Sequence, residues 1–297
     1  MNGCFTGERM RDMERQHPSL ILEGGTFRTV YTAGVLDYFL ERDLHMPYVL
    51  GISAGAISAC SYISKQKERT FRVIANYRND KRYIGMGNFF KKDRSYFGLD
   101  FSYNVIPNQI DYFDWTTFAQ HEGEVLFGVT NAYTGDIEYM NAKDMDEQSM
   151  MLRATCAIPI LFPEIKLNGI PYYDGGLSEP IPIKRAIADQ YDRHVLVLTQ
   201  PEGYEKKLDR SSKWVIKLFE RKYPKLAEQM KHRAERYNET IKDINRLEQA
   251  GDAFVFRPQY ALNSFEKDRF ILKRSYDMGY DLAKARFDDL QYFMHSK

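Results

Sequence analysis

Hydrophobic and polar positions along the chain follow the alternation of an α/β protein. Short apolar runs predict strands over residues 19–23 and 48–51, whereas apolar residues recur at helical spacing over 28–41. A glycine turn lies between the first strand and this helix, and a small-residue helix is expected over 56–65. The order strand, glycine loop, helix, strand, turn and helix is that of a βαβ unit, which predicts parallel strands with a right-handed crossover.

The same alternation continues farther along the chain. Residues 124–141 predict two strands joined at a Thr-Gly turn, and residues 145–159 predict a helix. A strand that runs into a turn is expected over 169–176, followed by a helix that begins after prolines over 179–190 and a buried strand over 194–200. This part of the chain therefore extends the α/β pattern.

The composition shifts after about residue 201. Two helices are expected over 205–248, divided at Pro224, and the second has a narrow apolar stripe that predicts packing against the domain. A further buried strand is expected over 253–258, and a last amphipathic helix reaches about Phe293. Because a strand returns after the long helices, we expect one compact domain with a C-terminal addition.

Composition and charge describe a folded protein with no global charge bias. The 297 residues include 42 Lys+Arg and 41 Asp+Glu, with 43% hydrophobic and 14% aromatic residues. Disordered chains have few aromatic residues and a large charge excess, so that class is excluded. The near-neutral balance also argues against binding to nucleic acid, which needs a strong cationic excess.

The cysteines and the N-terminus indicate the cellular setting. Cys4, Cys60 and Cys156 lie far apart and form no CxxC pattern, which favours a reducing compartment and predicts neither a disulfide framework nor a zinc site. Residues 1–17 carry charges where a signal peptide needs an apolar core. We therefore expect a cytoplasmic protein without a metal or other cofactor, and peripheral contact with a membrane stays open.

The segment Gly51 to Gly55 reads GISAG and matches the G-x-S-x-G pattern. Ser53 lies between an apolar strand and a small-residue helix, the placement that exposes a nucleophile on a sharp, strained turn. The helix also directs its N-terminal amides toward the serine oxygen. The sequence therefore predicts a serine nucleophile, with a close-packed strand-to-helix turn as the alternative.

A serine nucleophile needs donors for an oxyanion, and the loop after the first strand can supply them. Gly24 and Gly25 can present backbone amides without an interfering Cβ, and Arg28 can add positive charge. Since parallel strands of a βαβ unit end on the same side of the sheet, we expect this loop to lie beside Ser53. Taken alone, the loop could equally hold a phosphate, and Arg28 could form a surface ion pair.

The serine also needs a base, and no histidine has a suitable position. A triad of the usual chain order requires a histidine that follows an acid after the serine. The histidines either precede Ser53, lie in polar or terminal segments, or open a strand at its amino end. They are His17, His45, His121, His194, His232 and His295.

Asp174 is the better candidate for the base. It ends an apolar strand and is followed by Gly175 and Gly176, which free the backbone to bring the carboxylate close to another loop. A buried carboxylate within about 3 Å of a serine oxygen can accept its proton. The alternative is a tight Asp-Gly turn in a hairpin.

The glycine loop GGTFR, the GISAG segment and the DGG of Asp174, in this order, resemble the patatin-like phospholipase family. The stretch 153–183, RATCAIPILFPEIKLNGIPYYDGGLSEPIPI, strengthens the resemblance. It implies a three-layer α/β/α fold with a central, mostly parallel sheet and a helical C-terminal extension. It also implies a catalytic region over residues 18–190, with a strand and helical extension over 191–297 packed on the same domain.

The resemblance implies that Ser53 attacks a lipid acyl ester, that Asp174 activates Ser53 and later the water, and that the amides of Gly24, Gly25 and Thr26 hold the oxyanion. The family loop is usually G-G-G-x-R-G, and Thr26 and Thr29 replace its third and last glycines here. Two alternatives stay open. The acyl-serine could transfer its acyl group to an alcohol or thiol instead of water, or the chain could bind lipid without turnover.

Residues 65–94 contain ten basic and three acidic residues, and aromatic residues interleave from Phe89 to Tyr103. Basic charge and rings at 65–103 could bring the site to an anionic lipid surface. The rings considered for this role are Phe89, Phe90, Tyr96, Phe97 and Phe101. The alternative is a solvated loop with aromatic residues in the core. The oligomeric state is not indicated by the sequence.

Overall fold

A computed structural model describes residues 18–295 of the chain. Cys4, His17 and the charged N-terminal segment, for which no signal peptide is expected, lie outside the described residues. The strands are β1 (Ser19–Leu22), β2 (Tyr48–Ile52), β3 (Glu124–Asn131), β4 (Ile137–Asn141), β5 (Ile165–Leu167), β6 (Ile170–Asp174), β7 (His194–Val197) and β8 (Ala253–Phe256).

The α-helices are α2 (Thr29–Glu41), α3 (Ala54–Ile63), α4 (Arg69–Tyr77), α5 (Trp115–Ala119), α6 (Met150–Thr155), α7 (Ile183–Ala188), α8 (Arg210–Lys222), α9 (Pro224–Ala250), α10 (Arg269–Ala285) and α11 (Phe287–His295). Short 3-10 helices are η1 (Thr26–Arg28), η2 (Met86–Phe90), η4 (Ala142–Asp144) and η5 (Gly175–Leu177), and η3 (Phe101–Ile110) is a π-helix.

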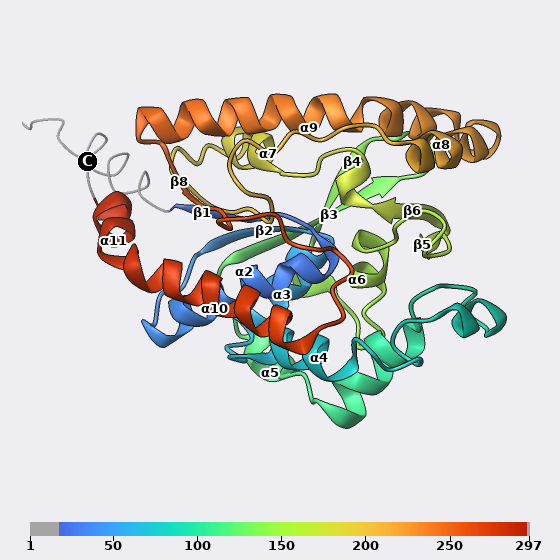
Figure 1. Ribbon diagram of the computed structural model, residues 1–297, viewed down its shortest axis with the longest axis horizontal. Coiled ribbons are helices and arrows are strands. Elements are labelled where there is room, and N and C mark those ends of the chain that lie inside the picture. The colour runs from blue at the N-terminus through green and yellow to red at the C-terminus, as the bar shows by residue number, and fades with distance from the viewer. Residues whose placement is uncertain (1–17, 296–297) are drawn as a thin grey trace, which may run out of the picture.

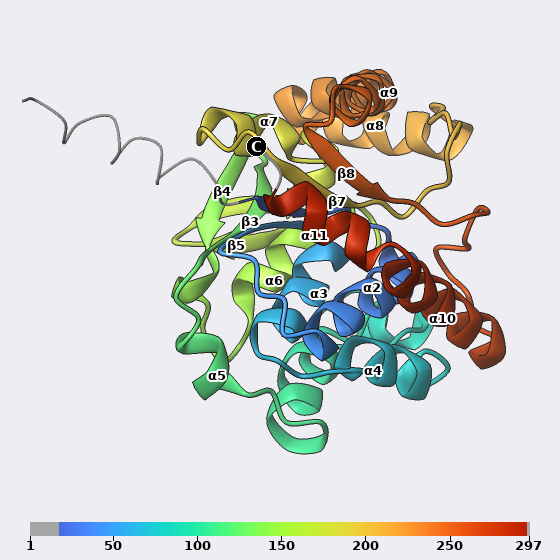
Figure 2. The same cartoon turned by 90° about the vertical axis from the view of Figure 1, so that its left-hand side faces the viewer.

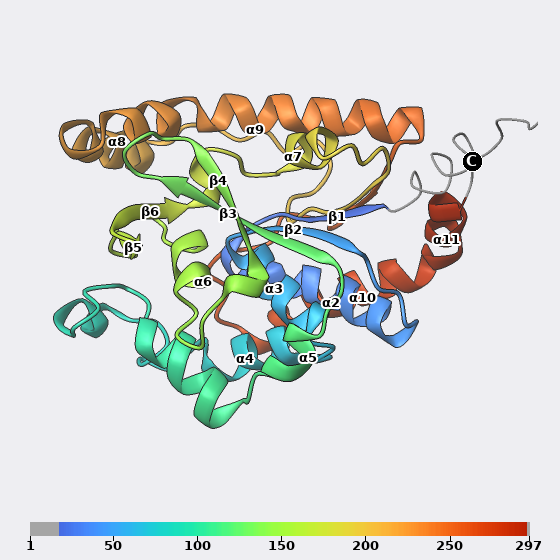
Figure 3. The same cartoon turned by 180° about the vertical axis from the view of Figure 1, so that it is seen from behind.

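The strands form one mixed sheet in the order β5-β6-β3-β2-β1-β7-β8, with β4 paired to β3. The central strands β3, β2, β1, β7 and β8 are parallel, whereas β4, β5 and β6 pair antiparallel. Helices α7, α8 and α9 cover one face of the sheet, and α2 to α6 with α10 cover the other (Figures 1 and 3). The three-layer fold expected from the sequence is therefore confirmed.

Alternate side chains of the central strands enter different halves of the core. On β1, Leu20 and Leu22 pack with the apolar side chains of α2 and α3, while Ile21 packs with those of α7 and α9. All three are fully buried. A continuous apolar run is typical of a parallel strand covered on both faces, which explains why the predicted strands contain so few polar residues.

The C-terminal part of the chain completes this architecture. Strand β7 pairs with β1 and β8 pairs with β7, so both extend the central sheet. Helix α10 lies along α2 (Figure 2). A Cβ on Gly34 of α2 would be 2.0 Å from the carbonyl oxygen of Tyr276, and one on Gly279 of α10 would be 2.1 Å from that of Tyr31. The missing side chain on each helix allows their backbones to approach closely.

Two predicted elements differ in the structure, and one segment contains helices that the sequence did not predict. The helix expected over 145–159 is confined to α6, because Ser149 has a φ of 54° and the Asp146 side chain caps the amide of Met150. The last helix is divided into α10 and α11 at Arg286, whose guanidinium donates to the carbonyl oxygen of Val255. Helix α4, the π-helix η3 and α5 lie in a segment whose sequence indicates only its basic charge and aromatic content.

Within residues 18–295, none of the helices combines the length and apolar character that crossing a bilayer requires.

Candidate active site at the carboxyl ends of the strands

Ser53 occupies a strained turn between β2 and α3. Its φ is 55° and its ψ is −126°, a region that non-glycine residues seldom adopt. The flanking glycines allow the turn to pack: a Cβ on Gly55 would lie 2.3 Å from the carbonyl oxygen of Leu22, and one on Gly51 would lie 2.7 Å from Cα of Ala56. The G-x-S-x-G pattern therefore reflects close backbone contact on both sides of the serine.

The turn is fixed by a residue that the sequence did not single out. The amide of Ser53 donates to Oγ1 of Thr155 at 2.9 Å, and this hydroxyl donates to the carbonyl oxygen of Gly128 at 2.6 Å. Thr155 ends α6, and Gly128 lies on β3 opposite Ile52. The serine turn is thus joined to the neighbouring strand through one buried hydroxyl.

The glycine loop after β1 lies directly beside Ser53, as the sequence predicted. A Cβ on Gly24 would be 2.9 Å from Cβ of Ser53. Within the part of the chain that the structure describes, the amides of Gly24, Gly25 and Thr26 donate to no oxygen atom. Amides without an internal acceptor beside a serine hydroxyl are suited to a developing oxyanion.

Arg28 follows the glycine loop and is held by residues from the second half of the chain. Its Nε donates to Oγ1 of Thr199 at 3.3 Å, and its Nη1 donates to Oγ of Ser264. The amide of Phe27 donates to the carbonyl oxygen of Ser264 at 3.2 Å. The loop between β8 and α10 thus crosses the glycine loop and orients the Arg28 guanidinium.

Strand β6 brings Asp174 to the end of β2. Strand β4 occupies one edge of β3 over Leu126 to Thr130, and β2 occupies the other edge as far as Gly128. Strand β6 continues along this second edge, with Asp174 opposite Val129. Asp174, the last residue of β6, therefore lies just beyond the end of β2 along this edge of β3, which places it next to Ser53.

Asp174 is buried, and its backbone and side chain are both anchored. Its amide donates to the carbonyl oxygen of Ala157 at 3.0 Å, and its own carbonyl oxygen accepts from Thr130 at 2.8 Å. Its Oδ1 accepts from the amide of Gly176 at 2.8 Å. Burial raises the pKa of the Asp174 carboxyl, and the contacts with Ser53 and Gly176 oppose this rise.

Helix α9 supports the turn that follows Asp174. Arg233 donates through Nε to the carbonyl oxygen of Gly176. Arg236 donates to the carbonyl oxygens of Ser178 and Leu177 at 3.1 and 3.0 Å. The sequence predicted the apolar stripe of this helix and missed the role of its arginines, because their partners lie about 58 residues earlier in the chain.

The described histidines lie away from Ser53. His194 opens β7 at its amino end, where its Nδ1 is 2.8 Å from Oγ of Ser19, and burial lowers its pKa to about 4. His232 lies exposed on α9 between Glu228 and Glu235. None of the histidines in residues 18–295 lines a cavity that contains Ser53.

Two cavities meet at Ser53. The apolar cavity has a volume of about 110 Å³, and its lining includes Ile57, Val73, Ile106, Leu152 and Phe162. The polar cavity has a volume of about 420 Å³, and its lining includes Glu23, Arg28, Asp174, Lys206 and Arg233. Both are lined by Ser53 and Thr26, so the serine separates an apolar compartment from a charged one.

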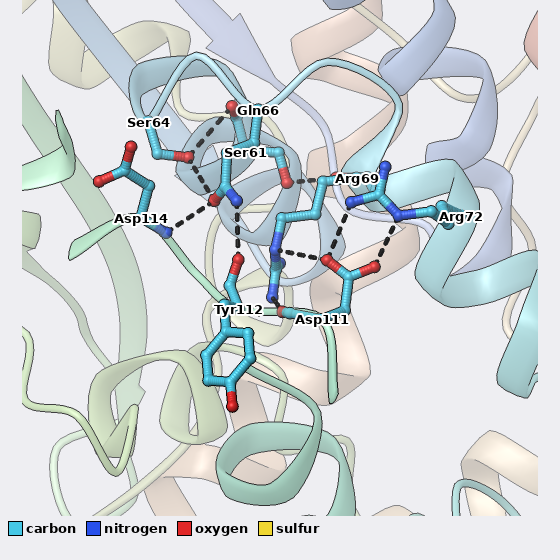
Figure 4. Close-up of polar contacts among 9 residues, drawn as sticks. Ser61, Ser64, Gln66, Arg69, Arg72, Asp111, Tyr112 and Asp114 are labelled. Atoms are coloured by element: carbon cyan, nitrogen blue, oxygen red, sulfur yellow. Dashed lines mark hydrogen bonds and ion pairs between the residues drawn. The ribbon is translucent and has the colours of Figure 1, made fainter. Parts of the chain in front are cut away.

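One wall of the apolar cavity is held by a polar cluster. Arg72 donates to both carboxylate oxygens of Asp111 at 2.6 and 2.9 Å, and Arg69 donates to the Asp111 carbonyl oxygen at 3.1 Å. Gln66 donates to the carbonyl oxygen of Tyr112 at 2.8 Å (Figure 4). The segment after η3 is therefore fixed against α4, which lines the same cavity.

Comparison with known proteins identifies the family. A family model described as patatin-like phospholipase matches residues 20–187, more than half of the chain. The chain belongs to the patatin-like phospholipase family. A second model, described as a domain of unknown function (DUF6363), matches residues 223–295. Helices α9, α10 and α11 and strand β8 of this patatin-like protein lie in that second region.

Two curated relatives and one solved structure resemble this patatin-like chain. "Uncharacterized protein YjjU" of Escherichia coli (strain K12) is 28% identical over 212 residues, which cover 65% of this chain and 54% of YjjU. "Probable lipid hydrolase 463L" of Invertebrate iridescent virus 6 is 26% identical over 223 residues, 68% of this chain and 69% of that protein. The match therefore spans about half the length of YjjU.

The solved structure is that of VipD from Legionella pneumophila. It is 12% identical in sequence with a TM-score of 0.47, and the match covers 92% of this chain and 67% of VipD.

The two threonines that replace glycines of the patatin loop have different environments. Thr26 has a φ of 52°, the left-handed conformation that favours glycine. Thr29 begins α2, where its hydroxyl donates to the carbonyl oxygen of Ala54 at 3.1 Å and lies 2.7 Å from Oγ of Ser58. Thr29 therefore joins α2 to α3, whereas Thr26 is a strained residue beside the serine.

The basic segment of the patatin-like chain is less exposed than its composition implies. Arg69 and Arg72 bind Asp111, and Arg78 donates to backbone oxygens of the loop before α10. Two of the five rings considered for a lipid surface, Phe97 and Phe101, are buried, so they cannot contact a membrane. Phe90 is 92% exposed and is followed by the exposed Lys91 and Lys92.

Proposed function

We propose that the protein is a serine acyl hydrolase that cleaves fatty acyl esters of phospholipids or related lipids. The observation that carries this proposal is the position of Ser53, on a strained turn beside Asp174, at the junction of the apolar and polar cavities. The name of the viral relative, a probable lipid hydrolase, supports the same substrate class. In this proposal residues 18–190 are the catalytic region and residues 191–297 complete the same domain.

In the proposed reaction, the Asp174 carboxylate accepts the proton of the Ser53 hydroxyl while the serine oxygen attacks the ester carbonyl carbon. The amides of Gly24, Gly25 and Thr26 donate to the oxyanion of the tetrahedral intermediate. The intermediate collapses when the carbon–oxygen bond to the alcohol breaks and Asp174 returns its proton to that oxygen. Water then attacks the acyl carbonyl carbon while Asp174 accepts its proton. The bond from this carbon to the serine oxygen breaks as Asp174 returns the proton to Ser53, which releases the fatty acid.

The two cavities fit the two parts of such a substrate. An acyl chain gains free energy by leaving water, and the apolar cavity offers side chains of that character. The alcohol part of a lipid carries polar groups, which the charged side chains of the polar cavity can bind. The proposal therefore places the acyl chain on the η3 side of Ser53 and the alcohol on the α9 side.

Ester hydrolysis and active-site labelling test this proposal. We expect the wild type to hydrolyse a fatty acyl ester and to react with a fluorophosphonate at Ser53. Ser53→Ala and Asp174→Asn should each lower turnover by at least about a thousandfold. Asp281→Asn, at an exposed position on α10, is the matched control and should leave turnover unchanged. Full activity of Ser53→Ala would refute the assignment of the nucleophile.

We also propose peripheral contact with a lipid surface through the segment around Phe90. Met86 and Phe90 are 68% and 92% exposed, and three basic residues follow within four positions. An exposed ring followed by lysines is suited to an anionic membrane, because the ring enters the interface while the lysines attract the lipid phosphates. This contact replaces the broader surface over 65–103 that the sequence predicted.

A further inference from the structure

We propose that Arg28, Lys206 and Arg233 bind the phosphate of a lipid head group in the polar cavity. This inference rests on the proposed function and specifies the alcohol part of the substrate. The three side chains come from η1, from the loop between β7 and α8, and from α9. All three line the polar cavity together with Ser53 and Asp174.

Each of the three cationic side chains keeps N–H donors that no group within residues 18–295 accepts. Within the described part of the chain, none of them forms an ion pair. Arg233 uses Nε for the carbonyl oxygen of Gly176, and Arg28 uses Nε and Nη1 for the hydroxyls of Thr199 and Ser264. Lys206 Nζ lies 4.9 Å from the centre of the Tyr237 ring and donates to no oxygen of residues 18–295.

The carboxylates that line the polar cavity are engaged elsewhere. Glu23 accepts from the amide of Thr199 at 2.6 Å. Asp174 accepts from the amide of Gly176, and Asp209 accepts from the amide of Ser212 at the start of α8. These carboxylates therefore satisfy backbone amides, and the unused N–H groups of the three cations, which line the same cavity, remain available for an anion.

Mutual repulsion among the cations supports the same conclusion. Burial and the charges of Arg233 and Arg28 lower the pKa of Lys206 to about 7, while the charges of Glu23 and Asp174 oppose the shift. Burial also lowers the pKa of Arg233. A bound phosphate would relieve this repulsion, since it places negative charge between groups that otherwise face like charge.

The position of the site gives the C-terminal region a part in substrate recognition. Lys206 and Arg233 both lie outside residues 20–187, the region matched by the patatin-like family model. Arg233 lies within residues 223–295, which match the domain of unknown function. The catalytic serine and the proposed phosphate site thus come from different parts of the chain and meet in one cavity.

A matched pair of substrates tests this assignment. Palmitoyl lysophosphatidate and palmitoyl glycerol carry the same acyl ester and differ in the phosphate. We expect Lys206→Gln to lower kcat/KM for the lysophosphatidate by about tenfold more than for palmitoyl glycerol. Lys207→Gln, at the exposed neighbouring position, should leave the ratio of the two values unchanged. An unchanged ratio in Lys206→Gln would overturn the proposal.

A binding experiment separates this inference from the proposed function. Calorimetry on the Ser53→Ala protein should detect glycerol 3-phosphate, with at least about tenfold weaker binding when Lys206→Gln is added. Glycerol should not bind. Equal affinity for inorganic phosphate and glycerol 3-phosphate would assign the cavity to a free phosphate and overturn the head-group assignment. Absence of ester hydrolysis by the wild type would refute the proposed function, while the binding result would still decide the anion site.

Discussion

The amide of Ser53 donates to the hydroxyl of Thr155, a residue 102 positions later, and the same hydroxyl donates to Gly128 on β3. Replacement Thr155→Val keeps the shape of the side chain and removes both hydrogen bonds. We expect a loss of about 1–3 kcal/mol in the free energy of unfolding, because two buried backbone groups lose their partner. Turnover should fall about tenfold or more, measured as kcat on the fatty acyl ester that the wild-type protein hydrolyses.

Thr155→Ser is the control for this change, since it keeps the hydroxyl and removes only a methyl group. Its kcat should stay close to that of the wild type. Equal losses in the valine and serine variants would show that packing, and not the hydrogen bonds, positions the turn.

Arg236 tests the support that α9 gives to the turn after Asp174. Arg236→Met keeps most of the aliphatic stem and removes the donors to the carbonyl oxygens of Leu177, Ser178 and Gln229. We expect denaturant unfolding to show a loss of about 1–3 kcal/mol, and we expect kcat to fall because the turn carries the aspartate. Arg246→Met, at a side chain that is 77% exposed on the same helix, should change neither quantity.

Thr26 is expected to cost stability at the position where the family loop usually has glycine. Its φ of 52° is unfavourable for a β-branched residue by about 1–2 kcal/mol. Thr26→Gly should remove this strain, partly offset by the greater entropy of glycine in the unfolded chain. We expect a net gain of about 1 kcal/mol and a rise in Tm of about 2 °C by calorimetry. A fall in Tm would show that contacts of the threonine outweigh its strain.

Asp37 makes the stability of the α2 region depend on pH. It is 4% exposed, and its pKa is raised to about 6 by burial, while the hydrogen bond from Tyr276 opposes the rise. Because the folded state keeps this proton over a range where the unfolded state has lost it, stability falls as pH rises from about 4 to about 6. The shift corresponds to about 3 kcal/mol.

Asp37→Asn removes this titration and keeps an oxygen that can accept from Tyr276. Between pH 4 and pH 7 the wild type should lose about 3 kcal/mol of unfolding free energy relative to the variant. Urea unfolding at several pH values measures the difference. Parallel stability curves for the two proteins would contradict the raised pKa.

Phe90 tests the proposed contact with lipid. Phe90→Ser should weaken binding to phosphatidylglycerol vesicles about tenfold, since a buried ring contributes roughly 1.5–3 kcal/mol. Lys91→Gln with Lys92→Gln should reduce the dependence of binding on salt. Phe270→Ser, at a ring that is 83% exposed on α10, serves as the control. Vesicle binding that is indifferent to all of these changes would refute the contact.

The sequence predicted those parts of the fold that depend on neighbouring residues. The strand and turn around Ser53, the strand that ends at Asp174 and the start of α9 at Pro224 each follow from short patterns. The proximity of the glycine loop to Ser53 also followed, because a βαβ unit brings the two strand ends together.

The supporting residues could not be predicted in the same way. Thr155, Arg233 and Ser264 act through partners that are 102, 57 and 236 residues away in the chain. A threonine or an arginine on a helix has many ordinary roles, and these partners come within reach only when the sheet and the helices that cover it have assembled. The π-helix η3 could not be predicted from the sequence either, because a proline such as Pro107 in the interior of a segment indicates that a helix is interrupted there.

The position of β1 between β2 and β7 has a consequence for how the chain is made. A ribosome delivers the glycine loop, Ser53 and Asp174 before β7, and at that stage one edge of β1 has no partner. The hydroxyl of Thr199, the arginines of α9 and the loop at Ser264 arrive later still. Assembly of the site therefore waits until nearly the whole chain has been synthesised, and a nascent chain that stops early exposes an apolar strand edge prone to aggregation.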